Sequence, residues 1–448
     1  MQKFSDFKLS EPLFRALNDL GFHSPTPIQV EAIPLLLQGP TDFLGLAATG
    51  TGKTAAFAIP LLEQIQPKKS QVQALILCPT RELALQVSKQ IDLLGRYRGV
   101  RSLSVYGGSN YQDQLYGLKR GVSIVVGTPG RVVDHLKRRT LDLSELQTLV
   151  LDEADEMISM GFQEDLETVL RSVPQGQSKT WLFSATMGSE VLKVAHRYLK
   201  NPKKVQVNRH EILPSGMEQI YYLTQESNKP EVLCKLIDGA ESFYGIVFCQ
   251  TKALVVDLQQ YLKNRGYGAD CLHGDMEQPA RDRAMKAFRE RKTAILVATD
   301  VACRGLDVQD ISHVINYSIP RELDHYVHRI GRTGRNGKFG IALSLVTPSH
   351  RSLIRRIEKM TQTTIKEGKI PTRKEIATKK IAQSLAFFKA QHSYGRAVEL
   401  LDDTWKGFVS EMSHEEIIGR FLSLMHPEVF SISDKNQSVR SLPRQKAS

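Results

Sequence analysis

The chain has 448 residues, of which 41% are hydrophobic and 24% charged, a balance that fits two or three globular domains. No apolar stretch approaches the roughly 20 residues that cross a bilayer, and the start MQKFSDFKLSEPL lacks the apolar core of a signal peptide. The five cysteines are odd in number and widely spaced, which argues against a zinc site or a disulfide framework and predicts reduced, mostly buried thiols in a cytoplasmic protein.

The formal net charge is +12, and much of this excess lies in one late stretch. Residues 351–380 contain ten Lys and Arg against three Glu, a local net charge of +7. Such a cluster favours a polyanionic partner, nucleic acid before membrane, because no strongly amphipathic anchor helix accompanies it.

Short β-branched apolar runs, each followed by a polar or glycine-rich cluster, recur over the first 350 residues. They lie at 43–48, 74–78, 123–127, 148–151 and 180–183, and after a break near 206–216 at 246–249, 294–298, 313–316 and 342–346. Continuous apolar runs that alternate with helical sequence predict parallel strands buried on both faces. The sequence therefore predicts two α/β domains, each with its polar clusters at the carboxyl edge of a sheet.

Residues 44–54 read LGLAATGTGKT, a glycine-rich turn after the first apolar run. A phosphate-binding P-loop usually begins with a glycine at the position that Ala47 occupies here. Two readings are open: a structural turn, or a cradle in which backbone N–H groups surround phosphates. In the second reading, Ala47 lies where the loop leaves the strand and does not obstruct the cradle. The candidate phosphate-binding residues are Thr49, Gly50, Thr51, Gly52, Lys53 and Thr54.

The acidic pair Asp152 and Glu153 decides between these readings. It follows the apolar run TLVL, as a Walker B pair does, although an acidic helix N-terminus is the alternative. A glycine-rich loop and an acidic pair together favour a nucleotide site. Mg²⁺ would be held by the hydroxyl of Thr54 and, partly through water, by Asp152. Glu153 would polarise the attacking water, and Lys53 would supply positive charge to the phosphates.

The letters of residues 152–155 spell DEAD, and the ordered motifs around them resemble those of the DEAD-box RNA helicases. The resemblance covers roughly residues 4–350. An alanine at the position of Ala47 is usual in that family. Ala48 stands where the family commonly carries Gln, and we expect no loss of hydrolysis from it. The resemblance implies two tandem RecA-like domains, with parallel sheets flanked by helices, and a mainly helical C-terminal extension like that of bacterial cold-shock-type members.

Domain boundaries follow from the resemblance. A RecA-like ATP-binding domain is expected over 1–206 with a Q motif at 4–32, a linker over 207–216, a second RecA-like domain over 217–360, a helical extension over 361–430 and a basic disordered tail over 431–448. The extension carries many large apolar side chains at helical spacing, and some relatives dimerise there. Two readings stay open: a homodimer through the extension, or its packing against the second domain of the same chain.

The resemblance also assigns residues to ATP and to coupling. Gln29, in GFHSPTPIQ, would offer a donor and an acceptor to adenine, and Phe4 would either support that segment or serve only as a core aromatic. Asp307 would accept a hydrogen bond from the ribose. Ser184 and Thr186 would link hydrolysis to strand separation.

Arginines recur at every third position in HRIGRTGR, residues 328–335. A solvated cationic helix face is the alternative, but two interspersed glycines argue against a plain helix. By resemblance, Arg332 and Arg335 would reach the γ-phosphate as arginine fingers, and Arg329 would organise the interface between the domains. The expected catalytic set is Lys53, Asp152, Glu153, Arg332 and Arg335.

The remaining motifs resemble loops that grip RNA phosphates and 2′-hydroxyls without reading bases. They comprise Pro79, Thr80, Arg81, Gly107, Gly108, Thr128, Pro129, Gly130 and Arg131 in the first domain, and His273, Gly274, Gln278, Arg281, Thr299 and Asp300 in the second. The sequence therefore predicts an ATP- and Mg²⁺-dependent helicase that unwinds or remodels short RNA duplexes and RNA–protein complexes with little sequence preference. A DNA translocase of the same superfamily and an ATP-gated RNA clamp with little unwinding are the alternatives. Partners in RNA processing or ribosome assembly are expected, and no membrane.

Overall fold

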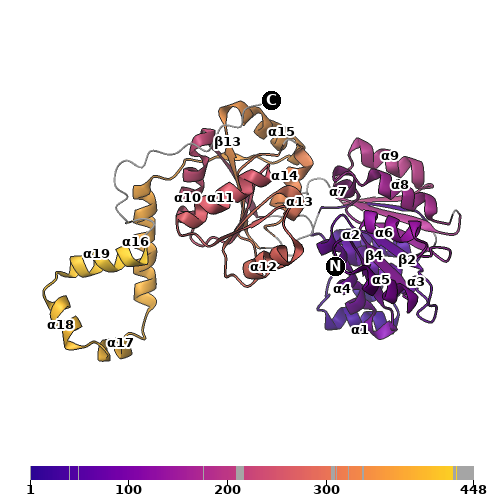
Figure 1. Cartoon of the computed structure of the whole chain (residues 1–448), viewed down its shortest axis with the longest axis horizontal. Coiled ribbons are helices and arrows are strands. Elements are labelled where there is room, and N and C mark those ends of the chain that lie inside the picture. Colours follow the sequence, from indigo (N-terminus) through magenta and orange to yellow (C-terminus); the bar gives the residue numbers. More distant parts are fainter. Residues whose placement is uncertain are drawn as a thin grey trace.

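The computed structural model describes residues 2–39, 41–48, 50–174, 176–207, 216–303, 308, 310–320, 322–334, 338–426 and 430. In this part of the chain, two parallel sheets of seven strands each form two domains, and a helical arm projects from the second domain (Figure 1). The predicted α/β architecture with a helical extension is confirmed. None of the helices in these ranges combines the length and the apolar character that a transmembrane span requires.

The first sheet has the strand order β3-β4-β2-β5-β6-β1-β7. Its strands are β1 (Phe43–Leu46), β2 (Ala74–Leu77), β3 (Ser102–Val105), β4 (Ile124–Gly127), β5 (Thr148–Leu151), β6 (Lys179–Ser184) and β7 (Lys203–Gln206). The apolar runs predicted as strands form the five central positions of this order. The two edge strands, β3 and β7, were not predicted.

Helices cover both faces of the first sheet, because side chains alternate between the faces along each strand. In β2, Ile76 joins one core cluster, whereas Leu75 and Leu77 join the other. The helices on the Ile76 face are α1 (Glu11–Asp19), α2 (Pro27–Leu37), α3 (Lys53–Gln64) and α4 (Arg81–Gly95). Those on the other face are α6 (Pro129–Lys137), α7 (Ala154–Ser159), α8 (Gln163–Ser172) and α9 (Ser189–Tyr198), while α5 (Tyr111–Lys119) packs beside β3. Burial on both faces is why these strands are continuous apolar runs.

The second sheet has the order β10-β11-β9-β12-β13-β8-β14. Its strands are β8 (Met217–Leu223), β9 (Gly245–Phe248), β10 (Ala269–Leu272), β11 (Ile295–Ala298), β12 (His313–Asn316), β13 (Gly340–Val346) and β14 (Lys366–Glu367). One face carries α10 (Lys229–Gly239) and α11 (Lys252–Asn264); the other carries α12 (Gln278–Arg289), α13 (Asp300–Cys303), α14 (Leu323–Ile330) and α15 (Arg351–Thr361). Four of the five cysteines are buried in these two domains, as expected.

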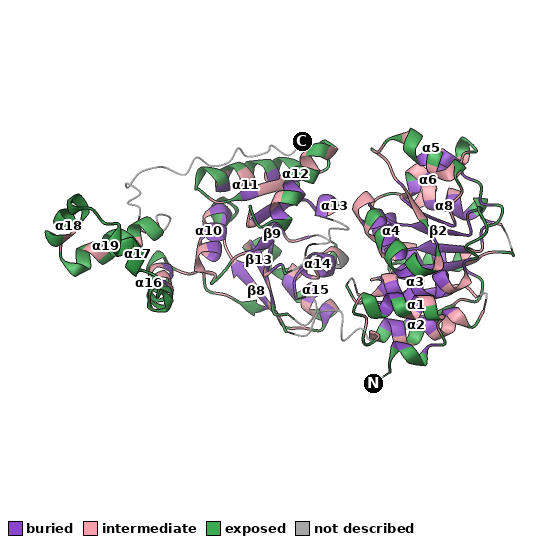
Figure 2. Ribbon diagram, turned by 90° about the horizontal axis from the view of Figure 1, so that it is seen from below, coloured by how far each residue is buried: buried purple, intermediate pink, exposed green. Residues whose placement is uncertain are grey.

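The arm consists of α16 (Arg373–Ala390), α17 (Gly395–Glu399), α18 (Asp403–Ser410) and α19 (His414–Met425). Its base is attached to the second domain, where the ammonium of Lys379 donates to the carbonyl of Gly239 at 2.7 Å. Farther out, most of its surface is exposed (Figure 2), and Phe388, Leu400 and Leu424 are 79%, 78% and 78% exposed. The reading in which the second domain covers these apolar side chains is therefore wrong for the described residues.

Candidate nucleotide and RNA site

The glycine-rich loop joins β1 to α3 at the carboxyl edge of the first sheet. Gly50 and Gly52 have φ angles of 84° and 91°, a left-handed conformation that suits glycine. A Cβ atom on Gly52 would lie 2.4 Å from Nε2 of Gln29, so the site has no room for a side chain there. Lys53 begins α3, and its ammonium donates to the carbonyl of Ala47 at 2.9 Å. The loop therefore has the backbone curvature and the positive charge of a phosphate cradle.

Gln29 is 3% exposed and connects this loop to the start of α2. Its Oε1 accepts a hydrogen bond from N of Thr26, and its Nε2 donates to O of Gly52, both at 3.0 Å. Each amide atom keeps one further hydrogen-bonding position, so the role toward adenine stays a prediction. Phe4 is buried and packs edge-to-face on Phe22 at 6.0 Å, and in this way it supports the segment that holds Gln29.

Asp152 and Glu153 follow β5 and are 2% and 7% exposed. Burial, together with the adjacent carboxylate of Glu153, raises the pKa of Asp152 to about 7, although the ammonium of Lys53 opposes this shift. Glu153 has a φ angle of 53°, a left-handed conformation that costs a residue with a side chain about 1–2 kcal/mol. Backbone strain of this kind clusters at functional sites. Two buried carboxylates beside one ammonium also leave an excess negative charge, which a bound cation would neutralise.

Asp155 joins the acidic motif to the loop that follows β6. Its Oδ2 accepts hydrogen bonds from N and Oγ1 of Thr186, both at 2.9 Å. Ser184 donates from Oγ to the carbonyl of Thr186 at 2.6 Å and so fixes the loop from its other side. Thr186 therefore contacts the acidic motif directly, and Ser184 is connected to the motif through Thr186.

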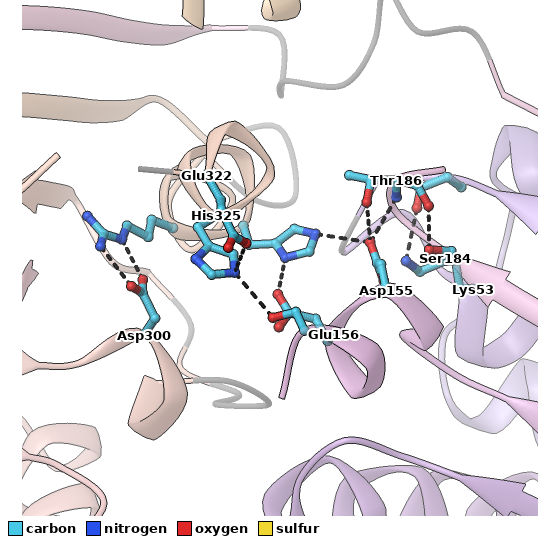
Figure 3. Close-up of polar contacts among 12 residues, drawn as sticks. Lys53, Asp155, Glu156, Ser184, Thr186, Asp300, Glu322 and His325 are labelled. Carbon is cyan, nitrogen blue, oxygen red and sulfur yellow. Dashed lines mark hydrogen bonds and ion pairs between the residues drawn. The ribbon is translucent and has the colours of Figure 1, made fainter. Parts of the chain in front are cut away.

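Two histidines of α14 face α7 across the cleft between the domains (Figure 3). Nδ1 of His328 donates to Oε1 of Glu156, and its Nε2 lies 3.6 Å from Oδ2 of Asp155. Nε2 of His325 lies 3.3 Å from Oγ of Ser159. Burial lowers the pKa of His328, but the hydrogen bond to Glu156 and the charges of the carboxylates outweigh it and raise the pKa above its usual value. His328 therefore links the two domains, and its contacts with Glu156 and Asp155 favour the protonated form.

Arg329 is 3% exposed and binds within the second domain. Its Nε and Nη2 donate to the two carboxylate oxygens of Asp300, the latter at 2.8 Å. Its Nη1 donates to Oδ1 of Asn316 at 3.0 Å and to the carbonyl of Ser318 at 2.6 Å. Its guanidinium lies 5.1 Å from the ring centroid of Phe248, which is a buried strand aromatic. Arg329 thus orders the strand ends beneath α14, and its role at the interface between the domains stays a prediction.

Arg332 is 7% exposed and lines a small interdomain cleft together with Glu156 and His328. A larger cleft of about 500 Å³ borders the glycine-rich loop, and its walls come from both domains. The first domain contributes Pro27, Ala47, Thr51 and Thr186 among others, and the second contributes Val327, Lys359, Met360 and Gln362. Three predicted ATP-site residues, Thr49, Asp307 and Arg335, lie outside the described residues, as do most of the predicted linker and the whole predicted tail.

The predicted RNA-contacting loops of the first domain follow the neighbouring strands β2, β3 and β4. Nη1 of Arg81 donates to the carbonyl of Gly107 at 3.3 Å, and a Cβ atom on Gly108 would lie 2.5 Å from that same nitrogen. Nη1 of Arg131 donates to Oε1 of Gln114 at 3.4 Å. The other predicted residues of this group, Pro79, Thr80, Thr128, Pro129 and Gly130, lie at or just before the N-termini of α4 and α6. Helix N-termini and guanidinium groups that gather on one edge suit a phosphate backbone.

The corresponding loops of the second domain follow β10 and β11. Arg281, in α12, donates to Oε1 of Glu82 in the first domain at 2.9 Å. Within the described residues, Nδ1 of His273 and Oε1 of Gln278 are buried without a hydrogen-bond partner. Buried polar atoms of this kind need a partner, which a bound ligand can provide. The carboxylate of Asp300 is occupied by Arg329, and its predicted contact with RNA stays a prediction.

Four residues at the junction of the domains had no predicted role of their own, although all but Glu156 stand within predicted motifs: Glu82, Asp155, Glu156 and His328. Asp155 and Glu156 follow the predicted acidic pair directly, so their position was the available signal. Nothing in the local pattern of Glu82 or His328 indicates the partner, because the partners lie 199 and 172 residues away.

Comparisons with known proteins agree with this geometry. Residues 26–194 match the family described as DEAD/DEAH box helicase, and residues 228–337 match the helicase conserved C-terminal domain. The first match contains the glycine-rich loop and the acidic pair, and the second contains the whole of α14. The two matches therefore divide the site in the same way as the two sheets.

Named relatives cover most of the chain. The DEAD-box ATP-dependent RNA helicase CshA of Bacillus subtilis is 42% identical over 407 residues, which span 89% of this chain and 82% of that protein. The CshA protein of Listeria monocytogenes is 45% identical over 392 residues, which span 86% of this chain and 75% of the relative.

Solved structures resemble the arrangement of both domains. Dbp5 of S. cerevisiae bound to RNA and ADP BeF3 matches with a TM-score of 0.77 and 31% identity, over 82% of this chain and 96% of that chain. The helicase Mss116 bound to ssRNA and UDP-BeF matches with a TM-score of 0.73 and 28% identity, over 84% of this chain and 81% of that chain. Because identity of this level extends across both domains and both family matches, the chain belongs to the DEAD-box family of helicases.

Proposed function

We propose that this chain is an RNA-stimulated ATPase that unwinds or remodels RNA by closing its two domains on the strand. The observation that carries the proposal is Asp155, whose carboxylate contacts Thr186 in the first domain and lies 3.6 Å from His328 in the second. Asp155 lies two residues after Glu153, which is assigned to ATP hydrolysis, so the site of hydrolysis and the contact between the domains meet in one short segment.

The nucleotide binds at the glycine-rich loop, with phosphates on the backbone of Gly50 and Gly52 and beside Lys53. The buried Asp152 and the hydroxyl of Thr54 offer the oxygen ligands that Mg²⁺ prefers, so these residues fit the ion. When bound, Mg²⁺ neutralises charge on the phosphates. Glu153 orients and deprotonates the attacking water.

Closure completes the site. Arg332, with Arg335 beyond the described residues, brings a guanidinium from the second domain to the γ-phosphate, where such a group is worth about 10³–10⁵ in rate. The chemistry therefore waits for the domains to meet, and any ligand that favours closure also favours hydrolysis.

RNA is the ligand that bridges the two domains, on the rim of the cleft opposite the nucleotide. The glycines, hydroxyls, helix N-termini and arginines assigned to RNA contact backbone and 2′-hydroxyl groups, which gives little sequence preference. Base-stacking aromatic residues are sparse among them. The basic stretch 351–380 adds a salt-dependent, nonspecific grip beside the second domain.

RNA and single-stranded DNA of matched sequence test the proposal. We expect ATPase activity to rise with RNA and much less with DNA, because the 2′-hydroxyl distinguishes the two. Equal stimulation by both would favour a DNA translocase. Stimulation by RNA without strand separation, measured on a short fluorescent duplex, would favour a clamp with little unwinding.

The arm is proposed to form a homodimer. Many large apolar side chains of the arm are exposed, among them Phe388, Trp405 and Leu424, and a second copy of the same helices would cover them. Of the expected domain limits (1–206, 217–360 and 361–430), the last assigns this surface to the extension, but the second domain continues past residue 360, because β14 pairs with β8 in its sheet and Ile365 lies in its core. A cytoplasmic location, with partners in RNA processing or ribosome assembly, completes the proposal.

A further inference from the structure

The RNA side of the cleft contains an ion pair that links the two domains directly. Nη2 of Arg281, in the first turn of α12, donates to Oε1 of Glu82, in the first turn of α4, at 2.9 Å. The two side chains are 13% and 20% exposed, so water screens the pair only in part. Partial burial strengthens the attraction but also costs desolvation, so removal of one partner leaves the other charge partly buried and unpaired.

The surroundings place this pair between the RNA-contacting motifs of both domains. Arg281 also lies 3.4 Å from the carbonyl of Ala302, close to the predicted contact Thr299. Glu82 follows Arg81, whose guanidinium binds the carbonyl of Gly107. The ion pair thus connects the loops that would hold one strand from two sides.

The negative charge of Glu82 is the informative feature. A carboxylate among residues that hold phosphates repels RNA, so contact with RNA does not account for it. The positive end of the α4 dipole stabilises the charge locally, and Arg281 satisfies it from the other domain. The structure thereby gives Glu82 a partner that exists only when the domains are together.

We propose that Glu82 and Arg281 form an interdomain latch on the RNA side, and that Arg281 is a positioning residue that acts through Glu82. The inference rests on RNA-driven closure as the function. RNA aligns the loops on either side of the pair, and the latch stabilises the same closed state, so the two effects add. Loss of the latch raises the RNA concentration needed for closure and leaves the chemistry of the closed state intact.

The sign of the effect of Glu82→Gln separates this latch from direct RNA binding by Arg281. If Arg281 only held a phosphate, removal of the nearby negative charge would lower the RNA concentration for half-maximal ATPase stimulation. The latch predicts the opposite: the RNA concentration for half-maximal stimulation rises by about tenfold, and the maximal rate at saturating RNA changes by less than about twofold. Thermal unfolding of the full chain shows whether the variant is folded. Glu82→Asp keeps the charge but shortens the side chain, and it gives an intermediate rise only if the pair matters.

A double-mutant cycle in the full-length protein completes the test. With a latch, Glu82→Gln with Arg281→Gln requires no more RNA than the weaker of the two single variants, because each substitution removes the same contact. Lys286→Gln is the matched control for Arg281→Gln, because it also removes one positive charge from α12, at a side chain that is 74% exposed. We expect it to change the half-maximal RNA concentration by less than about twofold. Two outcomes overturn the latch if RNA still stimulates the wild type. In one, the two single substitutions change the half-maximal RNA concentration in opposite directions and the changes add in the double variant; in the other, Glu82→Gln leaves this concentration unchanged. Absence of RNA stimulation in the wild type would instead overturn the proposed function.

Discussion

The carboxylate of Asp155 lies 3.6 Å from Nε2 of His328 across the cleft, and it also holds the backbone and hydroxyl of Thr186. One side chain of the first domain therefore touches both α14 and the loop after β6. A displacement of His328 as the domains separate changes the electrostatic surroundings of a carboxylate that positions this loop. This single contact gives a physical route between domain position and the coupling motif.

The charge on His328 makes closure depend on pH. Its pKa is raised in the closed arrangement, so the closed state binds the proton more tightly than a state in which the histidine meets water at its ordinary pKa of about 6.5. The resulting stabilisation is complete below that ordinary pKa and is lost as the pH rises through the raised value. We expect the RNA concentration for half-maximal ATPase stimulation to increase from about pH 6.5 upward, and His328→Gln to flatten the profile. A variant that keeps the wild-type slope would assign the titration to another group.

Glu153 and Lys53 are expected to fail in different ways. Glu153→Gln removes the group that accepts the proton of water, so hydrolysis falls by about 10²–10⁴ while ATP and RNA still bind. A long-lived complex with both ligands then accumulates, which a gel-shift assay in ATP detects. Lys53→Ala loses a charge in contact with the phosphates, and its affinity for a fluorescent ATP analogue decreases. Wild-type turnover by Glu153→Gln would contradict the assignment of the base.

Gly52→Ala separates backbone strain from crowding in the glycine-rich loop. The new methyl group would require both a left-handed alanine, at about 1–2 kcal/mol, and displacement of Gln29. Gly99→Ala is the matched control, because Gly99 also has a positive φ, 69°, but no atom within 4 Å of its added Cβ. We expect both variants to lose thermal stability and only Gly52→Ala to lose ATP affinity. Equal ATP affinities in the two variants would show that the contact with Gln29 is dispensable.

The arm is expected to associate through its exposed apolar face. Light scattering of the full-length protein at tens of micromolar, a range typical of weak dimers, should report a dimer. Phe388→Asp places a charge at a side chain that is 79% exposed and should yield a monomer with unchanged thermal stability. Lys389→Asp, at the neighbouring exposed position, should remain dimeric. A wild-type protein that is monomeric at these concentrations would remove the proposed dimer.

The apolar runs predicted the five central strands of the first sheet and β9, β11, β12 and β13 of the second, but neither the edge strands nor β8, which lies inside the second sheet and is only partly buried. Strands such as β2 and β5 are buried on both faces, so their residues form continuous apolar runs. β7 reads KKVQ and exposes three of its four residues, because an edge strand with one covered face carries charged side chains. β10, at the edge of the second sheet, reads ADCL and is only half buried. A continuous apolar run indicates a strand that is buried on both faces. Edge strands are buried too little to produce such a run.

The candidate site shows a similar division. The glycine-rich loop and the acidic pair are local patterns, and their described residues follow the strands predicted before them. The contacts of His328 with Glu156 and of Arg281 with Glu82 depend on how one domain packs against the other, which no local spacing encodes. The same holds for the amide of Gln29, whose bond to Gly52 joins residues 23 positions apart.

The attachment of the arm determines which part of the protein moves. β14 pairs in parallel with β8, and Lys379 bonds to the end of α10, so the base of the arm and the second sheet behave as one body. In a dimer joined by the arms, the two second domains would be the stationary part, and each first domain would move relative to them. Two such first domains can close at different times, so one site can release its products while the other still holds the same RNA.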